Sequence, residues 1–345
     1  MGLPWKYADE LSCIDLIIPH QIPIYNLIPT IIYAIMRKML NRMHKIKPSE
    51  AIVMKKIGGV IPAIFTPFAK DGSVNTEQLI KLTEFNLAQG VSGFYVNGSS
   101  GEAFLLTDEE RRHVYKTVKE TVGDRASCIA HVGCISTAQA IGFAKYAAEL
   151  KYDAVSAVAP FYYKFSAKEI MKYYFDIVDA CGMPLLIYNI PALSGVELSF
   201  DDICTLLKDE RIIGVKYTAS DFFKMQRIKN AFPDKVMLNG YDEMFACGMM
   251  SGADGGIGST YNFMAGKFIK IMELFAKKDI EGMQAIQNDA NLVIAELLKY
   301  GVMPGSKAIL DTFGLDMGDS RPPFSALTDE QKKALTDYVV PLIKK

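Results

Sequence analysis

The feature that most constrains the fold is a regular alternation of short apolar runs and amphipathic segments from Gly58 onward. The amphipathic segments have helical spacing; they include Thr76–Ala88, Thr107–Thr121, Thr137–Leu150 and Ala167–Cys181. The apolar runs have the composition of buried β-strands. These runs are Val60–Phe65, Gly93–Val96, Ser127–His131, Ala154–Val158, Pro184–Tyr188, Ile212–Lys216, Lys235–Leu238 and Asp254–Ile257.

Strands that alternate with helices predict a parallel sheet, and eight repeats suit a closed barrel. Helix starts support the segmentation, because Thr107-Asp-Glu-Glu has the pattern of a capping box. A doubly wound sheet is the alternative, but no nucleotide-binding fingerprint follows the first strand. The sequence therefore predicts an α/β fold of the (β/α)8 TIM-barrel type.

The C-terminal part exceeds what the last barrel helix needs. Helical patterns run through Asp279–Tyr300, Ser306–Phe313 and Thr328–Lys344, which predicts a helical appendage packed on the barrel. We therefore expect three parts: an extension over residues 1–53, a catalytic barrel over 54–278 and a helical region over 279–345.

The first 53 residues differ from the rest of the chain. Residues 13–45 are apolar but contain three prolines, and their basic residues follow the apolar run, which argues against a membrane span or a secretory signal. Ile31–Met43 could form a basic amphipathic helix, a pattern that permits contact with a membrane surface. We interpret residues 1–53 as a poorly ordered extension, or as translated sequence ahead of a start at Met54.

Composition narrows the class of function. The chain has 345 residues, of which 50% are hydrophobic, and a net charge of −1, which argues against nucleic acid as a partner. Its six cysteines form no CxxC pair, as expected of free thiols in a reducing compartment. We expect a cytoplasmic protein that binds a small molecule.

Active sites of such barrels lie at the carboxyl ends of the strands. Lys216 ends the sixth apolar run; burial there would lower its pKa and free the amine for attack on a carbonyl. The alternative is a lysine that extends to solvent. Tyr188 ends the fifth run, where it could transfer a proton or simply fill the barrel top.

Other strand ends carry polar and small residues. After the second run, Ser99 and Ser100 lie in a glycine-rich segment that could bind an anion or be an ordinary turn. Asp242 and Glu243, after the seventh, suit the hydroxyls of a polyol better than a metal, because no histidine or third acid is near. An amine nucleophile without a metal set indicates Schiff-base chemistry on a ketone.

Several motifs together resemble those of a known family. They are Phe65-Thr-Pro-Phe68, Gly98-Ser-Ser-Gly-Glu102, Tyr188-Asn-Ile-Pro191, Lys216 and Gly252-Ala-Asp-Gly-Gly-Ile-Gly-Ser259. From Gly58 to the C-terminus, the chain resembles the N-acetylneuraminate lyases, a branch of the dihydrodipicolinate synthase-like class I pyruvate aldolases. Residues 1–53 lie outside the resemblance.

The resemblance implies a role for each matching position. Lys216 would form the imine with sialic acid or pyruvate, and Tyr188 would shuttle the proton of the hydroxyl next to the cleaved bond. Ser99 and Ser100 would bind the carboxylate, although relatives often have threonine at the second position. Tyr162 would take part in a hydroxyl relay from a neighbouring subunit. Positions implied to hold the sugar chain are Thr218, Gly240, Asp242, Glu243, Gly258 and Ser259. A homotetramer without cofactor or metal is also implied.

One departure separates the branches of this family. The synthases have an arginine two residues after the proline of the Tyr-Asn-x-Pro motif, whereas this chain has Leu193. We therefore expect reversible cleavage of N-acetylneuraminate to N-acetylmannosamine and pyruvate. The alternatives are another pyruvate or 2-keto-acid aldolase, such as a sugar-acid aldolase, or a 4-hydroxy-tetrahydrodipicolinate synthase. An alternative of another class is a non-catalytic sialic-acid-binding protein.

Overall fold

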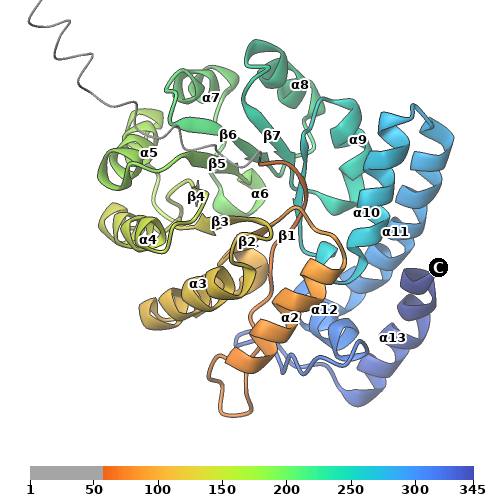
Figure 1. The fold of residues 1–345 in the computed structure, drawn as a ribbon. Coiled ribbons are helices and arrows are strands. Elements are labelled where there is room, and N and C mark those ends of the chain that lie inside the picture. The colour runs from red at the N-terminus through yellow and green to blue at the C-terminus, as the bar shows by residue number, and fades with distance from the viewer. Residues whose placement is uncertain (1–56) are drawn as a thin grey trace, which may run out of the picture. The chain divides into compact units, whose positions relative to one another are not determined.

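The computed structural model describes residues 57–345. Eight parallel strands form one sheet in the order β1-β8-β7-β6-β5-β4-β3-β2, which confirms the predicted (β/α)8 barrel (Figure 1). The expectations for residues 1–53, including membrane contact through residues 13–45, lie outside the described residues. The strands are β1 (Gly59–Pro62), β2 (Gly93–Val96), β3 (Ser127–His131), β4 (Ala154–Val158), β5 (Leu185–Asn189), β6 (Ile212–Tyr217), β7 (Val236–Asn239) and β8 (Gly255–Gly258).

The barrel closes between its first two strands. Ala63 and Tyr95 form a parallel bridge there, and the Ile64 N–H donates to the Tyr95 carbonyl at 3.1 Å. On the other side, β1 pairs with β8 along its full length. Both contacts of β1 leave the carboxyl ends of all strands around one mouth, where a site can be assembled from distant parts of the chain.

Each strand is buried on both faces, because helices cover the outside of the barrel and side chains fill its inside. Capping boxes start α3, α5 and α7, since Thr107, Ser166 and Ser199 each exchange hydrogen bonds with the residue three positions later. The surrounding helices are α2 (Thr76–Ala88), α3 (Asp108–Val122), α4 (Thr137–Glu149), α5 (Ala167–Cys181), α7 (Phe200–Leu207), α8 (Phe222–Ala231), α9 (Phe245–Met250) and α10 (Tyr261–Ala276).

The barrel interior is packed. Side chains that point inward from the strands form a separate apolar cluster, among them Ile61, Tyr95, Ile129, Leu186 and Leu238. A larger cluster lies between the sheet and the helices. The interior therefore supplies an apolar floor beneath the mouth of the barrel.

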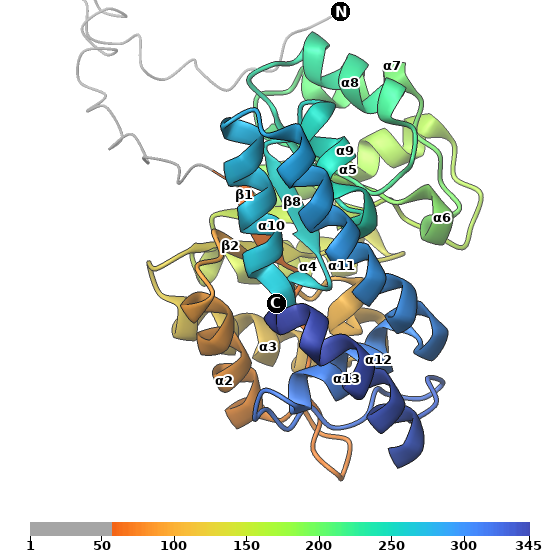
Figure 2. The ribbon, with the colours of Figure 1, turned by 90° about the vertical axis from the view of Figure 1, so that its right-hand side faces the viewer.

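The predicted C-terminal appendage is confirmed. Helices α11 (Ile280–Tyr300) and α12 (Val302–Asp311) pack against α10, and α13 (Asp329–Lys344) packs against α11 and α12 (Figure 2). Helix α12 begins at Val302, earlier than the predicted start at Ser306, because Pro304 lies in its first turn, where proline costs little. Across residues 57–345, no helix combines the length and apolar character that a membrane crossing needs.

We predict that Gly255→Ala destabilises the barrel. An alanine Cβ at this position, where φ is +149°, would lie 2.1 Å from the Gly59 carbonyl oxygen, and backbone cannot move aside. We expect the free energy of unfolding to fall by roughly 2–4 kcal/mol. Gly266→Ala is the control, since open space surrounds this helical glycine, and it should add about 0.5–1 kcal/mol. Equal thermal stability of the two variants would contradict the close approach of β1 and β8.

Candidate active site

Lys216 is a buried amine at the carboxyl end of β6. Its Nζ lies 4.2 Å from the ring centroid of Tyr95 and 4.0 Å from that of Tyr188, and the residue is only 4% exposed. The side chain therefore does not extend to solvent. Burial lowers the pKa of Lys216 to about 7, and the nearby negative charge of Asp242 opposes this shift. A large fraction of the amine is consequently neutral near physiological pH.

Tyr188 stands opposite Lys216 in the pairing of β5 with β6. Burial raises the pKa of its phenol to about 12, although the neighbouring Ser99 and Thr218 hydroxyls oppose the shift. The phenol is thus protonated at neutral pH and can donate a proton. To accept a proton from substrate, the phenol must at the same time pass its own proton to a neighbouring hydroxyl. The Thr218 hydroxyl, buried beside the phenol, can act as such a partner.

His131 packs edge-on against Tyr188, with the ring centroids 5.7 Å apart. Its Nε2 accepts a hydrogen bond from the Val158 N–H, so Nδ1 carries the proton and donates to the Asn97 carbonyl at 2.8 Å. Burial, followed by the charge of Arg111, lowers the pKa of His131 to about 3. The imidazole is therefore a neutral structural support for the Tyr188 ring.

The serine segment after β2 forms two short 3-10 turns, Ser99–Gly101 and Ala103–Leu105. The Ser100 hydroxyl lies 2.6 Å from the Ser259 hydroxyl, so loops from β2 and β8 meet here. Thr66 donates to the Gly101 carbonyl at 2.7 Å and fixes the turn from the β1 side. Hydroxyls that follow β2 and β8 therefore meet in the same cavity as the Lys216 amine.

Asp242 holds the loop after β8. Its Oδ2 accepts from the Thr260 N–H at 2.8 Å and from the Thr260 hydroxyl at 2.7 Å. Burial raises the pKa of Asp242 to about 6, against the lowering effect of Thr260. The Asp242 carboxylate therefore fixes Thr260 through one of its two oxygens.

Two glycines that the sequence places in the site leave room for neighbouring polar side-chain atoms. A Cβ on Gly258 would lie 2.0 Å from Asp242 Oδ1, and a Cβ on Gly240 would lie 1.8 Å from Thr218 Oγ1. Any side chain at either position would displace a polar atom of the site. Gly240 lines the cavity, whereas Gly258 is not among its lining residues.

A cavity of about 280 Å³ brings most of the predicted residues together. They are Ser99, Ser100, Tyr188, Lys216, Thr218, Gly240, Asp242, Glu243 and Ser259. Tyr162 is not among them, because it is 83% exposed on the loop after β4, with φ at 77°. Its implied role in a neighbouring subunit stays a prediction.

Sequence reasoning missed two groups of residues. Tyr95 supplies one of the rings beneath Lys216; the inward alternation of β2 would have placed it in the interior. The second group comes from α11 and α12, and no short-range pattern connects these helices with the barrel mouth. Its members in the cavity wall are Ile294, Leu297, Leu298, Val302 and Met303.

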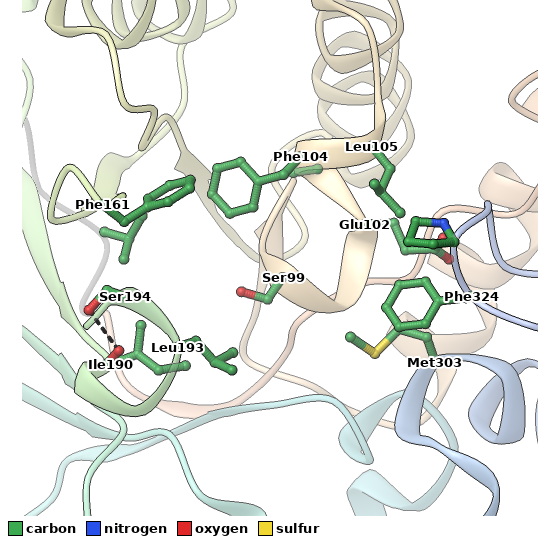
Figure 3. A pocket seen from close by; sticks show the side chains of 13 residues that line it. Ser99, Glu102, Phe104, Leu105, Phe161, Ile190, Leu193, Ser194, Met303 and Phe324 are labelled. Carbon is green, nitrogen blue, oxygen red and sulfur yellow. Dashed lines mark hydrogen bonds between the residues drawn. The ribbon is translucent and has the colours of Figure 1, made fainter. Parts of the chain in front are cut away.

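An apolar cavity of about 290 Å³ adjoins the first (Figure 3). Phe104, Phe161 and Phe324 line it, and Phe104 packs edge-on to Phe161 with the centroids 4.9 Å apart. It shares four residues with the polar cavity: Ser99, Ile190, Leu193 and Met303. Leu193 lies on the one-turn helix α6 (Pro191–Ser194) and lines both cavities.

A buried amine beside a phenol, at the carboxyl ends of barrel strands, has the layout of an imine-forming enzyme. Residues 56–341 match the model of the Dihydrodipicolinate synthetase family. The chain belongs to this family and is a class I aldolase of it.

Solved structures agree with this assignment. CdNal from Clostridium difficile, in complex with mannosamine, is 35% identical with a TM-score of 0.82, over 83% of this chain and 99% of that one. N-acetylneuraminate lyase from Fusobacterium nucleatum, complexed with pyruvate, is 36% identical with a TM-score of 0.80, over 84% and 97%. A catalytic lysine mutant of the Ruminococcus gnavus sialic acid aldolase is 31% identical with a TM-score of 0.81, over 84% and 99%.

We predict that Lys216→Met stabilises the protein in a pH-dependent way. The folded-state pKa of about 7 lies below the ordinary value of 10.5, so the unfolded chain binds more protons between these values. Wild-type stability therefore rises with pH across this window, whereas the contribution is absent in Lys216→Met. The variant should be more stable by several kcal/mol near pH 7, and its advantage should shrink towards pH 10.

Chemical denaturation at a series of pH values measures this difference. Lys145→Met, on the exposed surface of α4, is the matched control and should show no such pH-dependent advantage. A constant difference between Lys216→Met and wild type would mean that the amine is not desolvated.

Proposed function

We propose that this chain cleaves N-acetylneuraminate reversibly to N-acetylmannosamine and pyruvate. The observation that carries the proposal is the buried Lys216 amine, with its pKa near 7, at the floor of a cavity rich in hydroxyls. The neutral amine attacks the C2 ketone of the open-chain sugar acid, and loss of water gives an iminium. The C3–C4 bond then breaks, its electron pair moves into the iminium as an enamine, and the C4 hydroxyl becomes the aldehyde of N-acetylmannosamine.

Tyr188 handles the proton in this scheme. The proton leaves the C4 hydroxyl as the bond breaks and passes through the phenol and an adjoining hydroxyl, Ser99 or Thr218, which offset the high pKa of Tyr188. Protonation of the enamine at C3 and addition of water release pyruvate and regenerate the amine. Ser99 and Ser100 bind the substrate carboxylate, and Ser259 orients the Ser100 hydroxyl through their hydrogen bond.

The charge of the cavity supports a neutral second substrate. Among its described lining residues, Lys216 is the one cation, and Asp242 and Glu243 add negative charge. An aldehyde with its own carboxylate would find no cationic partner, whereas the hydroxyls of an acetamido sugar can donate to Glu243. The mannosamine and pyruvate complexes of the two relatives agree with such a pair of substrates.

We also propose a cytoplasmic homotetramer. Exposed aromatic side chains on neighbouring loops, Phe104 at 46% and Tyr162 at 83%, support a subunit contact beside the apolar cavity. In this arrangement, Tyr162 of a second copy would take part in the hydroxyl relay.

Trapping the imine tests the core of the proposal. Borohydride reduction in the presence of pyruvate should attach pyruvate irreversibly to Lys216, because reduction converts the imine into a stable secondary amine. Peptide mapping by mass spectrometry locates the adduct. Lys216→Arg is the control, since its permanently protonated guanidinium cannot attack a ketone. No adduct on the wild-type chain would overturn the aldolase and favour a sialic-acid-binding protein.

Leu193→Arg tests the choice between lyase and synthase. The guanidinium would give an anionic aldehyde a charge-assisted partner, so condensation of pyruvate with aspartate semialdehyde should rise by about tenfold. Leu193→Gln has comparable length without the charge and should show no such gain. The wild-type chain should release pyruvate from N-acetylneuraminate and condense aspartate semialdehyde more slowly than N-acetylmannosamine. The reverse preference would assign the chain to the synthases.

A further inference from the structure

The segment after β2 that carries Ser99 and Ser100 has an unusual backbone. Two residues other than glycine adopt the left-handed conformation here, Asn97 with φ at 57° and Glu102 with φ at 56°. Such positions cost free energy and persist only where their surroundings hold them. The two residues flank the serine turn, so the origin of that restraint bears directly on the placement of the serine hydroxyls.

Glu102 is held by the C-terminal region. Its Oε1 lies 2.8 Å from Nζ of Lys307 on α12, and their side chains are 0% and 2% exposed. Its Oε2 accepts the backbone N–H of Arg321 at 2.8 Å. The Lys307 ammonium also donates to the Asp319 carbonyl at 3.3 Å and lies over the Phe68 ring. Figure 3 shows Glu102 on the side of its loop that faces Phe324 and Met303.

A second contact holds the other end of the same loop. The Arg321 guanidinium donates to the Leu105 carbonyl at 2.9 Å and pairs with Glu110 at the start of α3. The loop is therefore fixed at Glu102 and at Leu105 by side chains that come from far along the chain. Between Glu102 and the serines the connection is direct, because the Glu102 N–H donates to the Ser99 carbonyl at 3.0 Å.

A fully buried ion pair is a poor device for stability alone. The two charges lose their hydration, and apolar side chains of similar volume often stabilise a core as well or better. An ion pair does, however, fix the position of one segment relative to another, because the carboxylate must remain within reach of the ammonium. This pair links α12 to the turn that carries Ser99 and Ser100.

We infer that Glu102 and Lys307 are positioning residues that fix the Ser99–Ser100 turn for the carboxylate of the keto acid. The inference rests on the proposed function, in which these serines bind that carboxylate. Neither Glu102 nor Lys307 touches the reacting atoms. They act through the Ser99 backbone, so their loss should affect recognition of the carboxylate and spare the Lys216 amine.

Two ketones distinguish this role from a general loss of structure. Pyruvate carries the carboxylate, and hydroxyacetone is a neutral ketone of similar size. In Glu102→Gln and Lys307→Met, we expect the rate of borohydride trapping at Lys216 to fall about tenfold to 100-fold with pyruvate and to change little with hydroxyacetone. An equal loss with both ketones would overturn the inference, because a distorted barrel would affect the amine itself.

The double variant Glu102→Gln/Lys307→Met separates positioning from stability. Each single variant leaves one buried charge unpaired and should have a lower melting temperature than the wild type. The double variant has no unpaired buried charge, so its melting temperature should return most of the way to the wild-type value. Selectivity for pyruvate should remain lost in the double variant, since no pair directs the turn. Recovery of pyruvate trapping together with the melting temperature would contradict a positioning role. Lys332→Met, which removes a more exposed ion pair with Asp319, is the matched control. It should leave the trapping rate with either ketone unchanged.

The wild-type chain in the same assay keeps the two hypotheses apart. If it gives no pyruvate adduct, the proposed function fails, and this inference fails with it. If the wild type is trapped by both ketones and the single variants retain the wild-type ratio, only the inference about Glu102 and Lys307 fails.

Discussion

The site depends on the desolvation of one amine, that of Lys216. Three features of its surroundings determine how far its pKa falls. The dry barrel interior removes water from the ammonium and favours the neutral form. The faces of Tyr95 and Tyr188, each close to Nζ, attract positive charge and limit this penalty. Asp242 limits it further. The result is an amine that exchanges its proton near neutral pH.

The same surroundings suit the intermediate of the proposed reaction. An iminium on Lys216 carries its positive charge where the ammonium carried it, between two aromatic rings and near a carboxylate. The enzyme would then need no rearrangement of charge when the imine forms. Asp242 combines this electrostatic role with a structural one, because its other interactions hold Thr260 and the loop after β8. Gly240 and Gly258 leave the room that these polar atoms occupy.

The fold and much of the candidate site could be predicted from the sequence because both follow short-range patterns. Eight apolar runs separated by amphipathic segments define the barrel, and the rule that barrel sites lie at strand ends selects Ser99, Tyr188 and Lys216. Contacts between distant segments could not be predicted in this way. The ion pair of Glu102 with Lys307 and the hydrogen bonds of Asp242 with Thr260 depend on the three-dimensional course of the loops, which local sequence does not determine. The start of α12 was misplaced for a local reason, since Pro304 looks like a helix breaker unless the first turn is known.

The C-terminal helices give the barrel mouth one wall, through residues such as Leu297 and Met303. This arrangement has a consequence for laboratory evolution of the chain. Combinatorial libraries of barrel enzymes are commonly confined to the loops that follow the strands, because these loops determine specificity and the rest of the barrel serves as scaffold. In this chain such a library would leave an entire side of the cavity unsampled. Randomising the junction of α11 and α12 would reach side chains of the cavity wall that no loop library can.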